Sequence, residues 1–87
     1  MSSIKDCLNR NVRITDERIN HIRENHPEFS YKDFDEKMIN TLQLPDIIIL
    51  SSSDKTVELF YKYYFNTPVG EKWLCIVVKN LENDFLI

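Results

Sequence analysis

Glycine is nearly absent from this sequence of 87 residues, since Gly70 is the only one. The glycine-rich loops that hold phosphate in dinucleotide-binding and P-loop proteins need several glycines at fixed spacings, so both loops are excluded. Apolar runs are also short, as in Ile47–Leu50, whereas a membrane-spanning helix needs about 20 apolar residues. We therefore expect no membrane partner.

Cysteine is scarce as well: Cys7 and Cys75 alone cannot make a disulfide framework. We expect two reduced, buried thiols in a reducing compartment. No spacing of cysteine and histidine matches a zinc site, so neither a metal nor another cofactor is expected. The first residues lack the charged-then-apolar pattern of a secretion signal, and we therefore expect a cytoplasmic protein.

Positive charge is in deficit, because 11 Lys and Arg stand against 14 Asp and Glu, and the net charge is −3. Binding of nucleic acid through bulk charge is excluded, and an enzyme acting on nucleic acid would need a local basic patch. Hydrophobic residues make up 43% and charged residues 29%, which is the balance of a soluble globular chain. The length allows a single domain, residues 1–87.

The period of the hydrophobic pattern changes near Pro45, from helical before it to strand-like after it. We divide the chain into a lead at residues 1–11, a helical part at 12–44 and a meander of strands at 45–87. The helical part opens with a short extended segment, Val12–Ile14.

The first helix is expected over Asp16–Asn25. Thr15 precedes it and can accept a hydrogen bond from a free first-turn N–H, and Pro27 ends it. His21 falls on the polar side of this helix. The apolar stripe, at spacings of 3, 4 and 3, consists of Ile19, Ile22, His26 and Phe29.

The second helix is expected over Tyr31–Leu44. Ser30 and Asp33 stand at the spacing of a capping box, and Pro45 follows the last turn. The buried stripe of this helix is predicted to be Phe34, Met38, Ile39 and Leu42.

Four strands should follow, at Ile47–Leu50, Thr56–Phe65, Lys72–Lys79 and Phe85–Ile87. The first is a β-branched run that we expect to be buried on both faces, and the third is apolar on both faces and should be central. The predicted class is α+β, with two N-terminal helices packed on one face of a three- to four-stranded antiparallel sheet.

The segment Arg13–Glu28 contains the pattern His-Ile-x-x-x-His-Pro-Glu. It resembles the opening of the phage-encoded nuclease-like domains grouped as the barnase–EndoU–colicin–RelE class. The helix-to-strand passage Leu42–Ile48 and the strand segments Glu58–Lys62 and Trp73–Lys79 are similar to the same family. The resemblance covers roughly residues 12–87.

This resemblance implies a metal-independent ribonuclease of the toxin type, in which the 2′-hydroxyl of RNA attacks the adjacent phosphate. Family members continue past the position of Phe85–Ile87 through a strand with Thr, Tyr and basic residues, whereas this sequence ends at Ile87. Activity would be lost if that strand supplies active-site groups. The final strand would then also offer an edge for pairing with another chain.

Such cleavage needs a base, an acid and cations for the phosphorane charge. The candidate catalytic residues are His21, His26 and Lys62. Each has a structural alternative: a solvated surface histidine, a capping histidine and a solvent-facing lysine. Glu28 would orient His26 or act as a base, or would be a satisfied carboxylate in a turn.

The candidate RNA-binding residues are Arg13, Arg18, Arg23 and Tyr61. The arginines, together with Arg10, would form the local basic patch, or else a solvated face of mixed charge. The tyrosine would stack a base, or pack across the strands. The ribonuclease hypothesis predicts that His21 and Lys62 share one cleft.

A second hypothesis is a catalytically inactive protein-binding module, such as an immunity protein, antitoxin or anti-host factor. It predicts scattered histidines and an exposed strand edge or apolar patch. The expected partners are RNA for the enzyme, and a cognate inhibitor or another protein for either hypothesis. A homodimer through edge strands is compatible with both.

Overall fold

The computed structural model describes residues 2–82 and 84–87. Each helix begins at the capping residue that the sequence predicts. Thr15 Oγ1 accepts a hydrogen bond from the Arg18 N–H at 3.1 Å and starts α1 (Asp16–Glu24). Ser30 Oγ accepts one from the Asp33 N–H, also at 3.1 Å, and starts α2 (Tyr31–Gln43). The two predicted helices are therefore confirmed to within one residue at each end.

The second helix supplies more of the core than the first. The buried residues of α2 are Phe34, Met38, Thr41 and Leu42. No residue of α1 is fully buried, and its Ile19 and Ile22 are only partly covered where they pack against the core. Hence α1 lies at the margin of the core, with one flank open to solvent.

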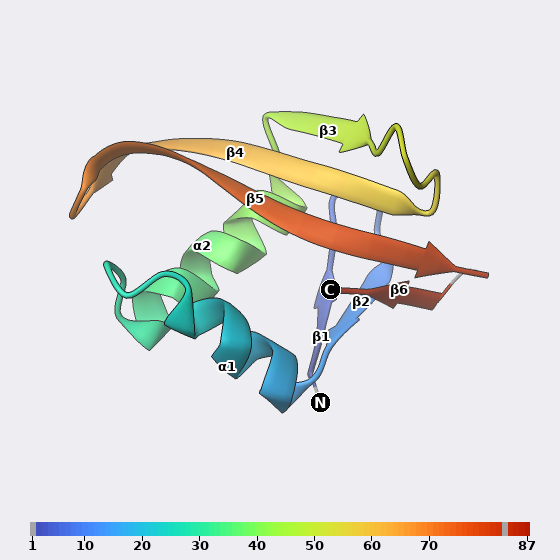
Figure 1. Ribbon diagram of the computed structural model, residues 1–87, viewed down its shortest axis with the longest axis horizontal. Coiled ribbons are helices and arrows are strands. Elements are labelled where there is room, and N and C mark those ends of the chain that lie inside the picture. The colour runs from blue at the N-terminus through green and yellow to red at the C-terminus, as the bar shows by residue number, and fades with distance from the viewer. Residues whose placement is uncertain (1, 83) are drawn as a thin grey trace.

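The strands form one mixed sheet with the order β1–β2–β6–β5–β4–β3. Figure 1 shows both helices on the same side of the long hairpin of β4 and β5. All neighbouring strands are antiparallel except β2 and β6, which are parallel. The strands are β1 (Ser2–Lys5), β2 (Asn11–Ile14), β3 (Ile47–Leu50), β4 (Val57–Thr67), β5 (Gly70–Leu81) and β6 (Asp84–Leu86).

This sheet shows that the predicted architecture was wrong. Two strands precede the helices, and the described residues form six strands rather than three or four. The parallel pair brings Val12 opposite Phe85, from opposite ends of the chain. Strand periodicity reports which residues alternate, but it carries no information about which distant segment becomes a neighbour, so this pairing left no local signal.

The core lies between the helices and one face of the sheet. Phe60 of β4 pairs with Ile76 of β5, and both side chains are buried under the helices. Leu74 and Val78 alternate with them on the same face, as expected for a period of two. Each such burial contributes about 1.5–3 kcal/mol to stability. We call this side the inner face.

The opposite side of the sheet, the outer face, carries the odd-numbered residues of β3 and β5 and those of β4 from Val57 to Tyr63. Two further expectations fail here. The four residues of β3 were predicted to be buried on both faces, yet they are 39–61% exposed. Trp73 and Val77 of β5 are also exposed, so this central strand is buried on one face alone. The reason is that β3 lies at the edge of the sheet and both helices pack on the inner face.

The last strand is not an edge, contrary to expectation. β6 lies between β2 and β5, and the open edges of the sheet are β1 and β3. Of the two thiols expected to be buried, Cys75 is half-buried and Cys7 is exposed, and both are free. No helix in the described part of the chain is long and apolar enough to cross a membrane.

Candidate functional site

Two concave regions border α1. The first, the α1 hollow, is lined by Thr15, Glu17, Arg18, Asn20, His21 and Glu24. The second, the α1–β5 groove, has a volume of about 180 Å³ and is lined by Arg18, Ile22, Asn25, His26, Cys75, Ile76, Val77 and Ile87. Arg18 belongs to both regions, and each region contains one of the two histidines.

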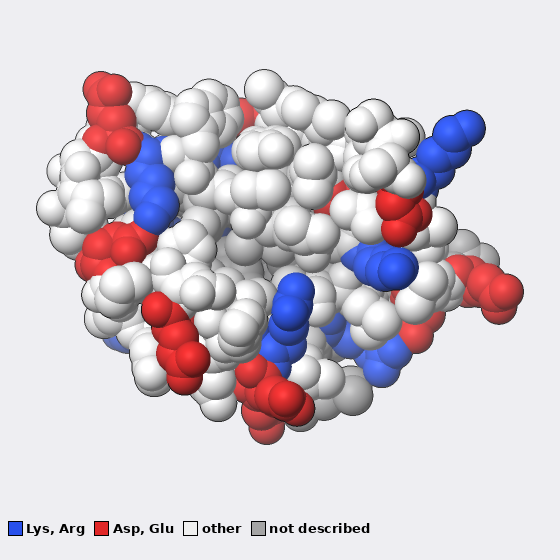
Figure 2. Space-filling view, in the orientation of Figure 1, with Lys and Arg blue, Asp and Glu red and all other residues white. Residues whose placement is uncertain are grey.

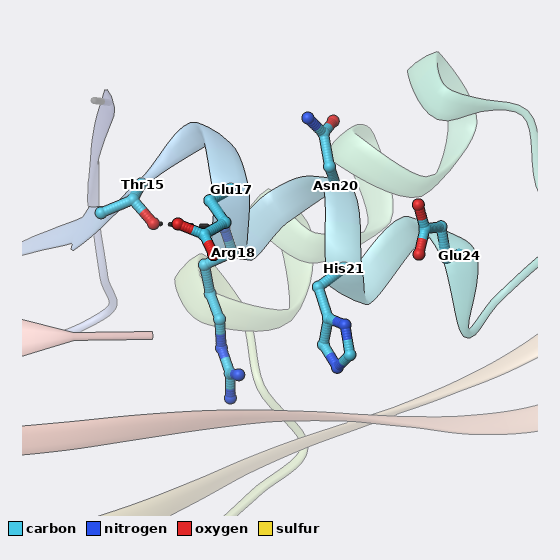
Figure 3. Close-up of a pocket in the computed structure, with 6 residues that line it drawn as sticks. All are labelled: Thr15, Glu17, Arg18, Asn20, His21 and Glu24. Atoms are coloured by element: carbon cyan, nitrogen blue, oxygen red, sulfur yellow. Dashed lines mark hydrogen bonds between the residues drawn. The ribbon is translucent and has the colours of Figure 1, made fainter.

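The helical period explains why Arg18 and His21 are neighbours. Residues three apart on a helix project from adjacent positions on its surface. Figure 3 shows both side chains extending from the same side of α1, toward the strands. Both are exposed, so they are accessible to a ligand from solvent.

The groove exists because β6 is short. It pairs with β5 only over Lys79–Leu81, which leaves Cys75–Val77 and Ile87 to line the groove. Ile22 contributes an apolar wall from α1. The result is a mixed surface, with an arginine and an imidazole over an apolar strand.

His26 is held firmly just beyond the end of α1. Its ring stacks on Phe34 with 5.2 Å between centroids and an interplanar angle of 18°. Its Nδ1 lies 3.3 Å from Glu28 Oε1 and 3.4 Å from Lys72 Nζ. Packing and polar contacts together fix the orientation of this half-buried ring.

Glu28 supplies the negative charge in the group that it forms with His26 and Lys72. Its Oε1 accepts a hydrogen bond from Lys72 Nζ, and that bond is the main reason why its pKa is lowered to about 2, with His26 contributing in the same direction. Glu28 is therefore ionised at neutral pH. A carboxylate of such low basicity orients the imidazole rather than accepting a substrate proton, so the orienting interpretation is the one favoured.

Lys72 is the residue that sequence reasoning missed. It stands at the start of β5, 46 positions from His26, and only the turn of the β4–β5 hairpin brings it to the helices. Nothing in the local sequence distinguishes it from any other strand-end lysine. A search for cations near the His-Pro-Glu segment along the chain could not have found it.

Lys62 lines neither of the two concave regions beside α1. Its Nζ donates a hydrogen bond to the Leu44 carbonyl at 2.7 Å, at the end of α2. Among the described contacts and pockets, none joins Lys62 to His21 or His26. The predicted cleft shared by His21 and Lys62 is therefore not formed by these contacts.

The other candidate cations are engaged with acids. Arg13 forms an ion pair with Asp84, and Arg23 binds Asp35 at 2.5 Å. Figure 2 shows acidic and basic side chains interleaved on this side of the molecule, without a large continuous basic area. Arg18 is thus the best placed of the predicted arginines to meet a phosphate.

Tyr61 lies on the outer face and lines neither of the two concave regions beside α1. A hydrogen bond with Cys75 raises the pKa of its hydroxyl, and it lines an apolar hollow with Ile47, Ile49 and Trp73. Within residues 2–82 and 84–87, no three histidine, cysteine or acidic side chains gather in a way that could hold a metal ion.

Comparisons with protein-family models, curated proteins and solved structures give no match to this chain. The resemblance seen in the sequence therefore stays a prediction. Any function of this chain has to be inferred from its own residues and their geometry.

Proposed function

We propose that this domain is a metal-independent ribonuclease whose active site lies along α1. One observation carries the proposal: Arg18 lines both the α1 hollow, with His21, and the α1–β5 groove, with His26. Two imidazoles, each sharing a concave region with the same arginine, are the groups that cleavage through the 2′-hydroxyl requires. Lys62 has no part in this site.

The reaction can be written with these groups. We place the ring proton of His26 on Nδ1, where Glu28 Oε1 at 3.3 Å can accept it, so that Nε2 takes the proton of the 2′-hydroxyl. The 2′-oxygen then bonds to phosphorus and the bond from phosphorus to the 5′-oxygen breaks. His21 donates a proton to that leaving oxygen. The products are a 2′,3′-cyclic phosphate and a 5′-hydroxyl.

Arg18 stabilises the charge that develops on the non-bridging oxygens. A guanidinium suits this task because its fork of N–H donors matches two phosphate oxygens at once. Arg13 and Arg23 are already paired with carboxylates, so binding of RNA rests mainly on Arg18. We therefore propose that the substrate is bound locally, over a few nucleotides.

The proposed setting is the reducing cytoplasm, where a ribonuclease meets its substrate. Two free thiols, one of them exposed on Cys7, fit that setting. A cognate inhibitor that covers α1 is the partner that an intracellular ribonuclease of the toxin type would require.

The experiment is cleavage of a short RNA by the purified chain in the presence of EDTA. We expect cyclic phosphate products, and a loss of about 10²-fold or more in rate for His21→Ala and for His26→Ala, the usual size of an acid or base contribution. Arg18→Ala should lose activity, whereas Lys32→Ala, which removes an exposed lysine from α2, should not. A folded chain that does not cleave RNA overturns the proposal.

A second candidate function is the protein-binding module without activity. The apolar outer face favours it, because large exposed apolar surfaces mark interaction sites. The cleavage assay separates the two, since a binding module predicts no rate above that of buffer.

A further inference from the structure

The outer face is an apolar surface that the two helices leave uncovered. Trp73 is 51% exposed and Val77 is 44% exposed, and Ile47 and Ile49 are exposed to a similar degree. In the inner face, the residues that alternate with these on β5 are buried. A sheet that is apolar on both faces needs a second layer on each of them.

The register divides the outer face into rows that cross the strands. The central row contains Ile47, Tyr61 and Cys75, which are paired across β3, β4 and β5. On one side of it lies an aliphatic row, made of Ile49, Leu59 and Val77. On the other side lies an aromatic row, Tyr63 and Trp73, with 5.3 Å between ring centroids.

Charges of opposite sign stand at the two ends of these rows. On β5, Lys79 follows the aliphatic row and Glu71 precedes the aromatic row, both on the outer side by alternation. A hydrogen bond with Glu71 raises the pKa of the Tyr63 hydroxyl, which places that carboxylate beside the aromatic row. Lys79 therefore lies at one end of the face, beside Asp54, and Glu71 lies at the other end.

We propose that the outer face is an interface between two copies of this chain, related by a two-fold axis that crosses the strands at the central row. Such an axis reverses the strand direction. It lays the aliphatic row of one copy over the aromatic row of the other, and Lys79 over the partner subunit's Glu71. An axis along β5 would instead lay Lys79 over Lys79 and Glu71 over Glu71, and an axis along β4 would pair neither charge, so the charges favour the first arrangement.

The size of the surface sets the expected affinity. With strands about 4.8 Å apart and about 3.4 Å per residue, nine residues of β4, nine of β5 and the four of β3 cover roughly 350 Å² in plan on each copy. The two copies together would bury roughly 700 Å², which is below the standard size of a specific interface and typical of a weak one. The apolar hollow of about 410 Å³ near the central row, lined by Ile47, Ile49, Tyr61 and Trp73, gives room for side chains of the second copy to enter. We therefore expect a reversible dimer with a dissociation constant near the micromolar range, on the order of 1 μM.

The test is sedimentation equilibrium of the 87-residue chain over a wide concentration range. We expect a monomer–dimer equilibrium. Val77→Lys should abolish it, because it buries a charge in the interface, while circular dichroism should show an unchanged fold, since Val77 faces away from the core. Val69→Lys is the matched control, because Val69 is an exposed valine in the turn of the β4–β5 hairpin, outside the three rows.

Charge reversal tests the two-fold arrangement itself. Lys79→Glu alone and Glu71→Lys alone should each weaken the dimer by about tenfold, because each places two pairs of like charges together. The variant with both changes should restore the original affinity. A chain that stays monomeric at all concentrations overturns the proposal. So does a dimer that is indifferent to Val77→Lys and to the reversals, which would indicate pairing through the edge strand β3.

Discussion

Lys72 and Glu28 form an ion pair that joins the start of β5 to the segment between the two helices. The two residues are 44 positions apart in the sequence, so only the fold brings them together. The pair is also the support of His26, whose Nδ1 lies within 3.4 Å of both side chains. One interaction thus fixes the hairpin against the helices and orients the proposed base.

Lys72→Met tests this pair as a positioning element. It leaves Glu28 partly buried without its cation, and we expect a loss of about 1–2 kcal/mol in the free energy of unfolding. RNA cleavage should fall, with its pH profile altered because the orientation of His26 changes. Urea unfolding and the pH–rate profile measure the two effects. Lys55→Met, an exposed lysine in the loop before β4, serves as the control and should change neither.

Acid stability tests the state of Glu28. Its pKa is about 2 in the folded protein and about 4.3 in an unfolded chain, so the unfolded state binds more protons between these values. This carboxylate therefore stabilises the fold above about pH 5, and that contribution, on the order of 2 kcal/mol, is lost as the pH falls toward 2. Glu28→Gln should flatten this part of the stability curve. An identical acid dependence in the variant and the parent would contradict the assignment.

Arg10 is predicted to be the most important cation for stability. Its Nε donates to Asp6 Oδ2 at 2.8 Å, and its Nη2 donates to Glu58 Oε1 at 2.6 Å. The side chain of Asp6 is fully buried, so Arg10→Met leaves a buried carboxylate without its cation, held by the backbone N–H groups of residues 8 and 10. We expect a loss of about 3 kcal/mol in denaturant unfolding. Lys5→Met, at an exposed lysine of β1, should cost far less, and equal costs would be inconsistent with this network.

Lys62 should behave as a structural residue. It donates to the Leu44 carbonyl beyond the last turn of α2, where lysine side chains commonly satisfy free carbonyls. Lys62→Met is expected to cost about 1 kcal/mol in unfolding free energy and to leave RNA cleavage unchanged. A large loss of cleavage in a folded Lys62→Met protein would show that Lys62 is part of the active site, as the sequence predicts.

The sequence predicted best where the signal is local. Thr15 and Ser30 cap the helices because a side-chain oxygen meets an N–H three residues away, an interaction that the sequence alone specifies. The burial of Phe34, Met38 and Leu42 follows from their spacing on a helix. Ile39, the fourth residue of the predicted stripe, is only half-buried, whereas Thr41, which was not predicted, is buried. The same helical period correctly predicts that His21 lies on the exposed side of α1.

Prediction from the sequence failed for contacts between segments that are far apart in the chain. The parallel pairing of β2 with β6, and the approach of Lys72 to Glu28, depend on tertiary structure alone. The prediction that β3 is buried on both faces failed for a related reason. A β-branched run of four residues predicts a strand, but its burial depends on where the strand lies in the sheet, and this strand lies at the edge.

The central claim is that the residues around α1 cleave RNA through the 2′-hydroxyl. The most direct test compares a short RNA with the same RNA carrying a 2′-deoxy sugar at the cleaved position, in EDTA, with the parent chain and His26→Ala. We predict a 2′,3′-cyclic phosphate product from the first RNA alone, and a rate lower by about 10²-fold in the variant. Cleavage of the deoxy substrate, or equal rates for the parent and the variant, would contradict the claim.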